Sequence, residues 1–226
     1  METTVRSVTV TGESKFERDY FEKTYRNYSR QNPRRKLRFY RKIVERVAPR
    51  DRTPRILDIG CAFGAFLSEL NPEWKRFGMD VSGFAIDRAA QAQPGATFAR
   101  ADITDIPFPG PFDIITALDV IEHVPSLEQA ASSIKAKLSP EGLFMFVVPV
   151  YDGPTGPLVH LLDRDETHLH KQSRNFWLRW AEERFVLVEW CGLLRYLLPG
   201  GYYVHVTTRA LRRFTPAIAV VARNRP

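Results

Sequence analysis

Cysteine is scarce in this chain, and its scarcity excludes several classes of protein. Only two cysteines, Cys61 and Cys191, occur among the 226 residues. A structural zinc site needs four ligands at close spacing, and a disulfide framework needs more cysteines than are present. We therefore expect two reduced thiols and a fold stabilised by its apolar core.

Long apolar runs are also missing. The apolar stretch at 142–150 is far shorter than the roughly 20 residues of a membrane-spanning helix, and it is typical of a buried strand. Residues 1–12 are polar and lack the apolar centre of a signal peptide. We expect a globular, cytoplasmic protein without a membrane span.

Acidic residues are few in one part of the chain, where positive charge accumulates. The formal net charge is +7, and between residues 30 and 55 only Glu45 and Asp51 oppose eleven Lys and Arg residues. Such a stretch could attract a phosphate-bearing partner or an anionic substrate, or it could be a solvated helix face. Aromatic residues are not interleaved as a stacking platform requires, so nucleic acid is not the partner we expect.

Strand-like and helix-like segments alternate from residue 55 onward, after a helical region at 13–48 that Pro33 divides. The apolar runs predict seven strands, at 55–59, 76–79, 97–100, 112–118, 143–148, 185–190 and 217–222. Helical patterns lie between them, at 65–70, 83–91, 126–138 and 173–183. We expect an α/β fold, a Rossmann-like seven-stranded mostly parallel sheet with helices on both faces.

The alternation is interrupted after the fifth predicted strand. Residues 150–172 begin with glycines and prolines and continue with three histidines and four carboxylates. Open α/β sheets bind ligands beyond the carboxyl ends of their strands, and long loops there are usually functional. We divide the chain into an N-terminal helical extension or lid at 1–54 and a domain at 55–226, with a ligand-site insertion at about 150–175.

A glycine turn follows the first predicted strand, with the sequence LDIGCAFG at 57–64. Asp58 precedes the first glycine by two residues, where it would repel a dinucleotide pyrophosphate but attract the positive groups of S-adenosylmethionine (SAM). Asp80 ends the next strand 22 positions later, a spacing at which an acidic residue accepts hydrogen bonds from ribose. Asp102 is placed to accept from an adenine amino group, with Ile103 on the ring, and a loop cap is the alternative for Asp102.

These motifs resemble those of the class I SAM-dependent methyltransferases. Within that family they are similar to the branch that includes ubiquinone-biosynthesis and many small-molecule methyltransferases. The resemblance is carried by LDIGCAFG at 57–64, Asp80, ADI at 101–103, LSPEG at 138–142 and, most specifically, FDIITALDVIEHV at 112–124. It covers about 55–149 well, although the family usually has glycine where Ala62 stands. In its last strand, 217–222, the resemblance implies an antiparallel direction.

The resemblance implies SAM as the cofactor and S-adenosylhomocysteine as the product. It implies that Asp58 and the glycine turn hold the methionine part, and that strand four ends near the methyl group. An N-terminal helix could also close over SAM with a tyrosine hydroxyl, or simply pack on the domain. The expected cofactor-binding residues are Asp58, Gly60, Cys61, Ala62, Gly64, Asp80, Val81, Asp102, Ile103, Leu118, Asp119, Tyr25 and Tyr28.

Three histidines are candidates for a general base, which methyl transfer needs only when the nucleophile must lose a proton. His123 follows strand four, and His168 and His170 lie in the insertion. For each of them the alternative is a local hydrogen bond that fixes a loop. A metal site built from His168, His170 and a carboxylate receives little weight, and we expect no metal.

We therefore expect a methyltransferase that acts on an oxygen, nitrogen or carbon of a small molecule, of natural-product or glycan-pathway type, and an anionic acceptor fits the basic stretch. One alternative is a methyltransferase acting on RNA or protein, which the basic stretch favours and the lack of an RNA-binding module disfavours. Another is a non-catalytic SAM-binding protein, which the intact acidic residues disfavour. Whether the protein forms a homodimer stays open.

Overall fold

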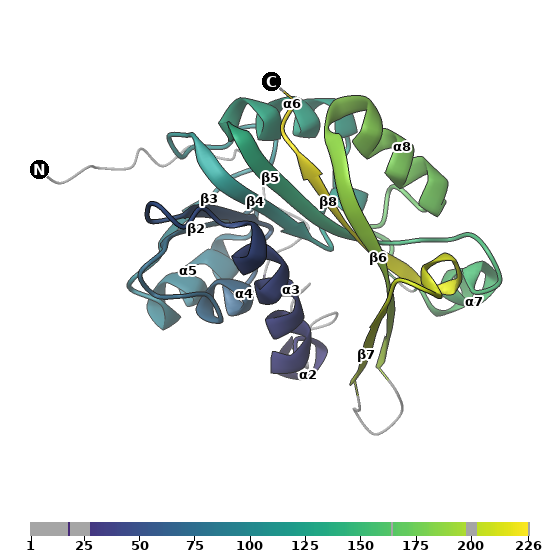
Figure 1. Cartoon of the computed structure of the whole chain (residues 1–226). Coiled ribbons are helices and arrows are strands. Elements are labelled where there is room, and N and C mark those ends of the chain that lie inside the picture. Colours follow the sequence, from purple (N-terminus) through teal and green to yellow (C-terminus); the bar gives the residue numbers. More distant parts are fainter. Residues whose placement is uncertain (1–17, 19–27, 164, 198–202, 226) are drawn as a thin grey trace, which may run out of the picture.

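A single sheet of eight strands organises the computed structural model, which describes residues 18, 28–163, 165–197 and 203–225 (Figure 1). The strand order is β3-β2-β1-β4-β5-β8-β6-β7. The strands are β1 (Arg55–Ile59), β2 (Lys75–Asp80), β3 (Thr97–Arg100), β4 (Phe112–Leu118), β5 (Leu138–Pro149), β6 (Val186–Leu197), β7 (Tyr203–Thr208) and β8 (Ala217–Arg223). The strand order reverses between β1 and β4, and open sheets of this kind bind ligands at that point.

Strand direction follows the expected Rossmann-like pattern. The neighbours from β3 to β5 are parallel, whereas β8 runs antiparallel to both β5 and β6. The predicted α/β class, the mostly parallel sheet and the antiparallel last strand are confirmed. The strand count is eight rather than seven.

Helices cover both faces of the sheet (Figure 1). The helices α2 (Tyr28–Gln31), α3 (Arg34–Val47), α4 (Ala65–Ser68) and α5 (Gly83–Ala92) lie on one side, and α6 (Leu127–Lys137) and α8 (Arg174–Arg184) on the other. Successive strand residues point to opposite faces. Ile114 of β4 accordingly packs with the α3 and α4 side chains, and Ile115 with those of α6 and α8. None of the described helices combines the length and apolarity that crossing a membrane requires.

The helix α3 is amphipathic, and Pro33 separates it from α2 as predicted. Its buried residues recur at helical spacing and are Lys36, Leu37, Tyr40, Ile43 and Val44. Four of them are apolar or aromatic and join the core under the sheet. Lys36 is the exception, because it is a cation on a buried helix face.

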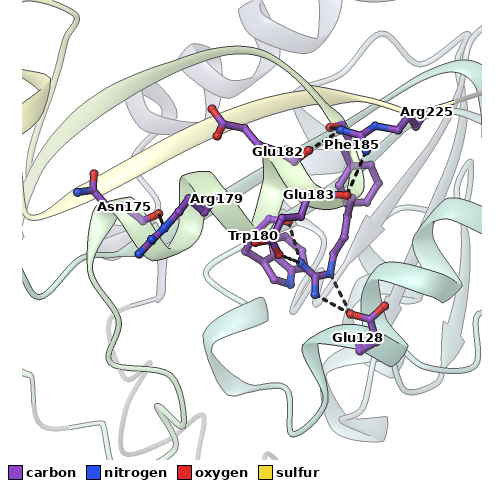
Figure 2. A network of polar contacts seen from close by, with 9 residues as sticks. Glu128, Asn175, Arg179, Trp180, Glu182, Glu183, Phe185 and Arg225 are labelled. Atoms are coloured by element: carbon purple, nitrogen blue, oxygen red, sulfur yellow. Dashed lines mark hydrogen bonds and ion pairs between the residues drawn. The ribbon is translucent and has the colours of Figure 1, made fainter.

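Polar contacts join α8 to α6 and to the end of the chain (Figure 2). The Arg184 guanidinium donates to Glu128 Oε2 at 2.7 Å and to the Trp180 carbonyl at 3.2 Å. Arg225 donates to the Glu182 carbonyl at 2.6 Å. Glu128 is largely exposed, so its ion pair contributes less than about 1 kcal/mol. The apolar packing of Trp177 and Trp180 against the sheet holds α8 more firmly.

The sixth predicted strand, 185–190, was too short, and the strand after it was missed. β6 continues to Leu197 and forms a hairpin with β7, in which Leu197 pairs with Tyr203 and Gly192 with Thr208. The alternation in YVHVTT at 203–208 is a strand signal that the sequence analysis did not use. The hairpin extends beyond the rest of the sheet, and His205 of β7 packs on Phe39 of α3 (Figure 1).

Two local features go beyond the elements expected from the sequence. The segment LSPEG at 138–142 lies inside β5, where the register with β4 shifts between Phe112 and Ile114. Residues 156–162 of the insertion form a short helix, α7 (Gly156–Leu162), with Pro157 in its first turn, where a missing N–H costs nothing. The boundary at residue 54 stays a prediction.

Capping gives a stability prediction for α6. The Ser126 hydroxyl accepts a hydrogen bond from the Gln129 N–H at 3.3 Å. Removing an N-cap side chain costs about 1 kcal/mol, so we expect Ser126→Ala to lower the free energy of unfolding by that amount in urea titrations. Ser132→Ala, on the exposed middle of the same helix, is the control and should leave stability equal or slightly higher. Equal losses in both variants would contradict the capping role.

Candidate active site

The turn after β1 has the backbone of a ligand-binding loop. Gly60, Ala62 and Gly64 have φ values of 66°, 46° and 72°, all in the left-handed region. A Cβ on Gly60 would lie 2.3 Å from Val120 Cγ2, so only glycine fits against the segment after β4. Ala62 takes the left-handed conformation at some cost, which the glycine that the family resemblance implies at this position would avoid.

Two carboxylates lie beside this turn at the carboxyl ends of β1 and β2. Asp58 is 3% exposed and accepts a hydrogen bond from Thr116 Oγ1 at 2.6 Å. Asp80 accepts from the Ala62 N–H and the Ser82 N–H, each at 2.9 Å. Burial raises the pKa of Asp58 to about 7, and the nearby Asp80 adds to the effect. The two carboxylates therefore stand at adjacent strand ends beside the glycine turn.

The residues expected around an adenine ring are divided between a loop and the core. Asp102 accepts hydrogen bonds from the N–H and the hydroxyl of Thr104, at 2.9 and 2.7 Å, and so caps its own loop. Ile103 is 4% exposed and packs in the core on the α6 and α8 side. Val81 and Leu118 are partly exposed at the ends of β2 and β4. An adenine contact from Asp102 and Ile103 stays a prediction.

Tyr28 of α2 lies against the glycine turn. Its ring contacts Phe63 edge-on with a centroid distance of 4.7 Å. Burial raises the pKa of the Tyr28 hydroxyl, and Cys61, Asp58 and Asp80 add to the effect, which places the hydroxyl near the two carboxylates. A lid role of Tyr28 over SAM stays a prediction, and Tyr25 lies outside the described residues.

A compact ion cluster lies beyond the end of β4. Asp119 has a φ of 61°, and its Oδ2 lies 2.5 Å from Arg195 Nη1 of β6 and 3.8 Å from Lys36 Nζ of α3. Burial acts to raise the pKa of Asp119, but Arg195 and Lys36 outweigh it and lower the pKa. Burial lowers the pKa of Lys36 to about 8. A non-glycine residue in this strained conformation is typical of functional sites.

The histidine after β4 belongs to a second polar group. His123 Nδ1 lies 2.9 Å from Thr167 Oγ1, and Thr167 bonds in turn to Asp165. Burial, and then His168, lower the pKa of His123 to about 4. Glu122 is 1% exposed, and neither of its carboxylate oxygens has a hydrogen-bond partner among the described residues. Burial and the charge of Asp119 raise the pKa of Glu122.

The loop after β5 holds His168 in a fixed orientation. His168 Nδ1 lies 2.9 Å from Asp163 Oδ2 and 3.0 Å from the Tyr151 hydroxyl, which itself bonds to Asp163 at 2.6 Å. The His168 ring packs on His123 at 4.6 Å. His170 is separate, because its Nε2 lies 2.8 Å from the Val124 carbonyl and so anchors the loop.

One group in the described part of the chain has the arrangement of metal ligands. Single ligand atoms of Glu122, His123 and His168 lie within 4.8 Å of one another. The trio considered from the sequence paired His168 with His170, and the structure does not bring those two together around a carboxylate. We expected no metal, and the structure, which holds no ions, does not test that expectation.

Several members of this site were not expected from the sequence. They are Lys36, Glu122, Tyr151, Asp163 and Arg195, which come from α3, the segments after β4 and β5, and β6. A signal existed only for Lys36, which occupies a buried position in the helical repeat of α3. The others are polar residues in segments whose folded path the sequence does not specify.

Comparison with known proteins agrees with this geometry. The sequence model of the family described as "Methyltransferase domain" matches residues 28–185. The chain belongs to the methyltransferase domain family. It is a class I SAM-dependent methyltransferase domain, and SAM is its cofactor.

Individual relatives of this methyltransferase domain are distant. The polyketide synthase ThaQ of Burkholderia thailandensis is 29% identical over 138 residues, which are 55% of this chain and 6% of that protein. The matched segments span 27%, 6% and 26% of the curated relatives, so the chain corresponds to a small part of each.

Solved structures share the fold at low sequence identity. A Haloferax volcanii protein solved with the Trm112 methyltransferase activator has a TM-score of 0.70 at 16% identity, covering 96% of this chain and 100% of that one. The N-methyltransferase NodS of Bradyrhizobium japonicum, solved with S-adenosylhomocysteine, has a TM-score of 0.56 at 21% identity, covering 83% and 86%.

The residues of the methyltransferase domain fit a positively charged cofactor. Asp58 is buried and has no ion pair with any described residue. A cation beside it would therefore offset the cost of its burial. A pyrophosphate in the same place would meet two carboxylates, which agrees with SAM and disagrees with NAD.

The raised pKa of Asp58 gives a pH prediction for the methyltransferase. The ionised carboxylate attracts the SAM ammonium, whereas the protonated form does not. With a pKa of about 7, the ionised fraction rises roughly tenfold between pH 6 and pH 8, and we expect SAM affinity to rise with it. Calorimetric titrations across this range would measure the effect.

Asp58→Asn is the control for that profile, because it cannot ionise and should bind SAM weakly with little pH dependence. In the protein without cofactor, stability should change with pH in the direction opposite to SAM affinity. Because the folded pKa lies above the unfolded one, the free energy of unfolding should fall as pH rises from about 4 to 7. A flat SAM affinity in the wild type would contradict the role of Asp58.

Proposed function

We propose that this methyltransferase transfers a methyl group from SAM to a nucleophile of a small molecule, with His168 as the general base. The observation that carries the proposal is the His168–Asp163 pair, with an Nδ1–Oδ2 distance of 2.9 Å, at the carboxyl end of the sheet. His168 lies close enough to Asp119 to lower its pKa, and Asp119 follows β4, where the family resemblance places the methyl group.

The geometry supports different roles for the residues of the site. Bound SAM supplies an activated methyl group on a sulfonium. The Asp163 carboxylate orients His168 through Nδ1, so that Nε2 can take the proton that a hydroxyl or amine nucleophile loses. Asp119 Oδ1 has no hydrogen-bond partner among the described residues and can orient the same nucleophile. Tyr151 holds the loop that carries His168.

A small acceptor is favoured by the form of the site. The insertion closes over the β4 end through backbone bonds from the Leu169 and His170 N–H groups to the Glu122 carbonyl. Relatives of natural-product type, such as the polyketide synthase, agree with an acceptor of that class. RNA or protein is the second candidate, favoured by the seven basic residues of α3.

A transfer experiment separates these candidates. The full chain is incubated with methyl-labelled SAM and with a cell extract divided into small-molecule, RNA and protein fractions. Label in the small-molecule fraction would support the proposal, and label confined to RNA or protein would replace it with the second candidate. Binding of SAM without transfer to any fraction would favour a non-catalytic SAM-binding protein.

A further inference from the structure

A basic cavity lies between α3 and β7, outside the residues assigned to SAM or to the proton transfer. Its volume is about 420 Å³, within the range of small-ligand sites. The cavity is lined by Arg35, Arg38, Phe39, Lys42, His205, Val206 and Thr207. Three of these seven residues are cations, and none is acidic. The charge balance of the lining therefore favours an anion as occupant.

The spacing of the cations explains why they converge. Arg35, Arg38 and Lys42 stand at positions i, i+3 and i+7 of α3, which share one face of a helix. The other cations of α3 have carboxylate partners, and these include Arg38 of the lining, whose Nε lies 3.7 Å from Glu69 Oε2. Arg35 and Lys42 have no hydrogen bond or ion pair among the described residues. The two cations without partners thus line the same cavity.

The opposite wall adds a buried histidine. His205 is 4% exposed and packs on Phe39 and Tyr40 of α3, with centroid distances of 5.6 and 5.8 Å. Burial, and then Lys36, Arg195 and Arg35, lower the pKa of His205 to about 4. The cations therefore create a positive potential that reaches the cavity wall, which an anion would relieve.

The cavity lies beside the residues that hold Asp119. His205 is the cross-strand partner of Arg195, and residues directly opposite in a sheet share a face. Arg195 bonds to Asp119 at 2.5 Å, and Lys36, next to Arg35 in the chain, lies 3.8 Å from the same carboxylate. The cavity wall and the ion cluster at Asp119 are therefore joined by one cross-strand pair of the β6–β7 hairpin.

We propose that the α3–β7 cavity binds a phosphoryl group of the methyl acceptor, so that the substrate is a phosphate- or diphosphate-bearing small molecule. Guanidinium groups bind phosphate oxygens with paired, charge-assisted hydrogen bonds, and several cations suit a multivalent anion better than a single carboxylate. This inference rests on the proposed function, since it concerns the acceptor of that reaction.

Pyrophosphate is the probe that tests this inference, in calorimetric titrations of the full chain with and without saturating SAM. We expect the wild type to bind pyrophosphate and Arg35→Gln/Lys42→Gln to bind it at least about tenfold more weakly. Arg50→Gln/Lys75→Gln removes the same charge from exposed positions elsewhere and should bind like the wild type. SAM affinity should be equal in all three proteins.

Three outcomes would overturn the inference. Absence of pyrophosphate binding in a wild type that binds SAM would remove the phosphoryl site and leave the proposed function standing. If pyrophosphate binding were weakened equally in both double variants, the loss would be an effect of net charge and not of the cavity. Much tighter binding of an RNA oligonucleotide, lost in the same cavity variant, would assign the cavity to a macromolecule. Failure to bind SAM would instead contradict the cofactor site.

Discussion

We expect Asp80→Ala to weaken SAM binding by about a hundredfold or more. The Asp80 carboxylate accepts from the Ala62 N–H and the Ser82 N–H, and so it holds the glycine turn against the end of β2. The family resemblance also assigns the ribose hydroxyls to it. Each hydrogen bond to a charged group contributes about 1.5–3 kcal/mol. The loss of two such bonds to the ribose hydroxyls would therefore lower the binding free energy of SAM by at least about 3 kcal/mol.

Calorimetry with SAM and with NAD would measure this effect. Asp87→Ala, an exposed carboxylate on α5, is the matched control and should bind SAM like the wild type. Circular dichroism and a thermal melt would establish that Asp80→Ala is folded. A folded Asp80→Ala protein with unchanged SAM affinity would contradict the site, and NAD binding by the wild type would contradict the choice of cofactor.

The second large effect is expected at His168. If His168 takes the proton of the nucleophile, His168→Asn should lower kcat by about 10²–10⁴-fold. SAM affinity should change little, because His168 contacts Asp163, Tyr151 and His123 rather than the glycine turn. Turnover would be followed as methyl transfer to the acceptor that the labelling experiment identifies.

Two comparisons make the His168 result specific. His160→Asn changes an exposed histidine on α7 and should leave kcat near the wild-type value. Asp163→Asn keeps the shape of the orienting group and should lower kcat while leaving SAM affinity unchanged. If a chelator abolishes wild-type activity and a divalent metal restores it, His168 acts as a ligand with Glu122 and His123 rather than as a base.

The placement of the histidines illustrates what lies beyond sequence reasoning. His123, His168 and His170 are similar candidates in the sequence, because all three follow strands near the expected ligand edge. In the structure His170 bonds to the Val124 carbonyl, and His168 bonds to Asp163. The difference depends on the path of the loop after β5, which contacts between distant segments determine.

The basic stretch of α3 also shows what the sequence indicates and what only the structure decides. Its excess of charge is evident from composition, and the sequence left open a solvated face, an anionic substrate or a phosphate-bearing partner. The structure separates the cations by partner: several pair with carboxylates, Lys36 lies beside Asp119, and Arg35 and Lys42 line a cavity. That cavity requires β7, the one strand the sequence analysis missed.

The sequence by itself determined the fold class, the order of most elements and the cofactor edge of the sheet. Those features depend on local signals, namely apolar periodicity, glycines in a tight turn and carboxylates at strand ends. Only the tertiary structure decided which polar residues of α3 and β6 meet at Asp119. Lys36 and Arg195 lie 83 and 76 positions from Asp119 in the sequence, and they come together there through helix packing and sheet pairing, which no local pattern records.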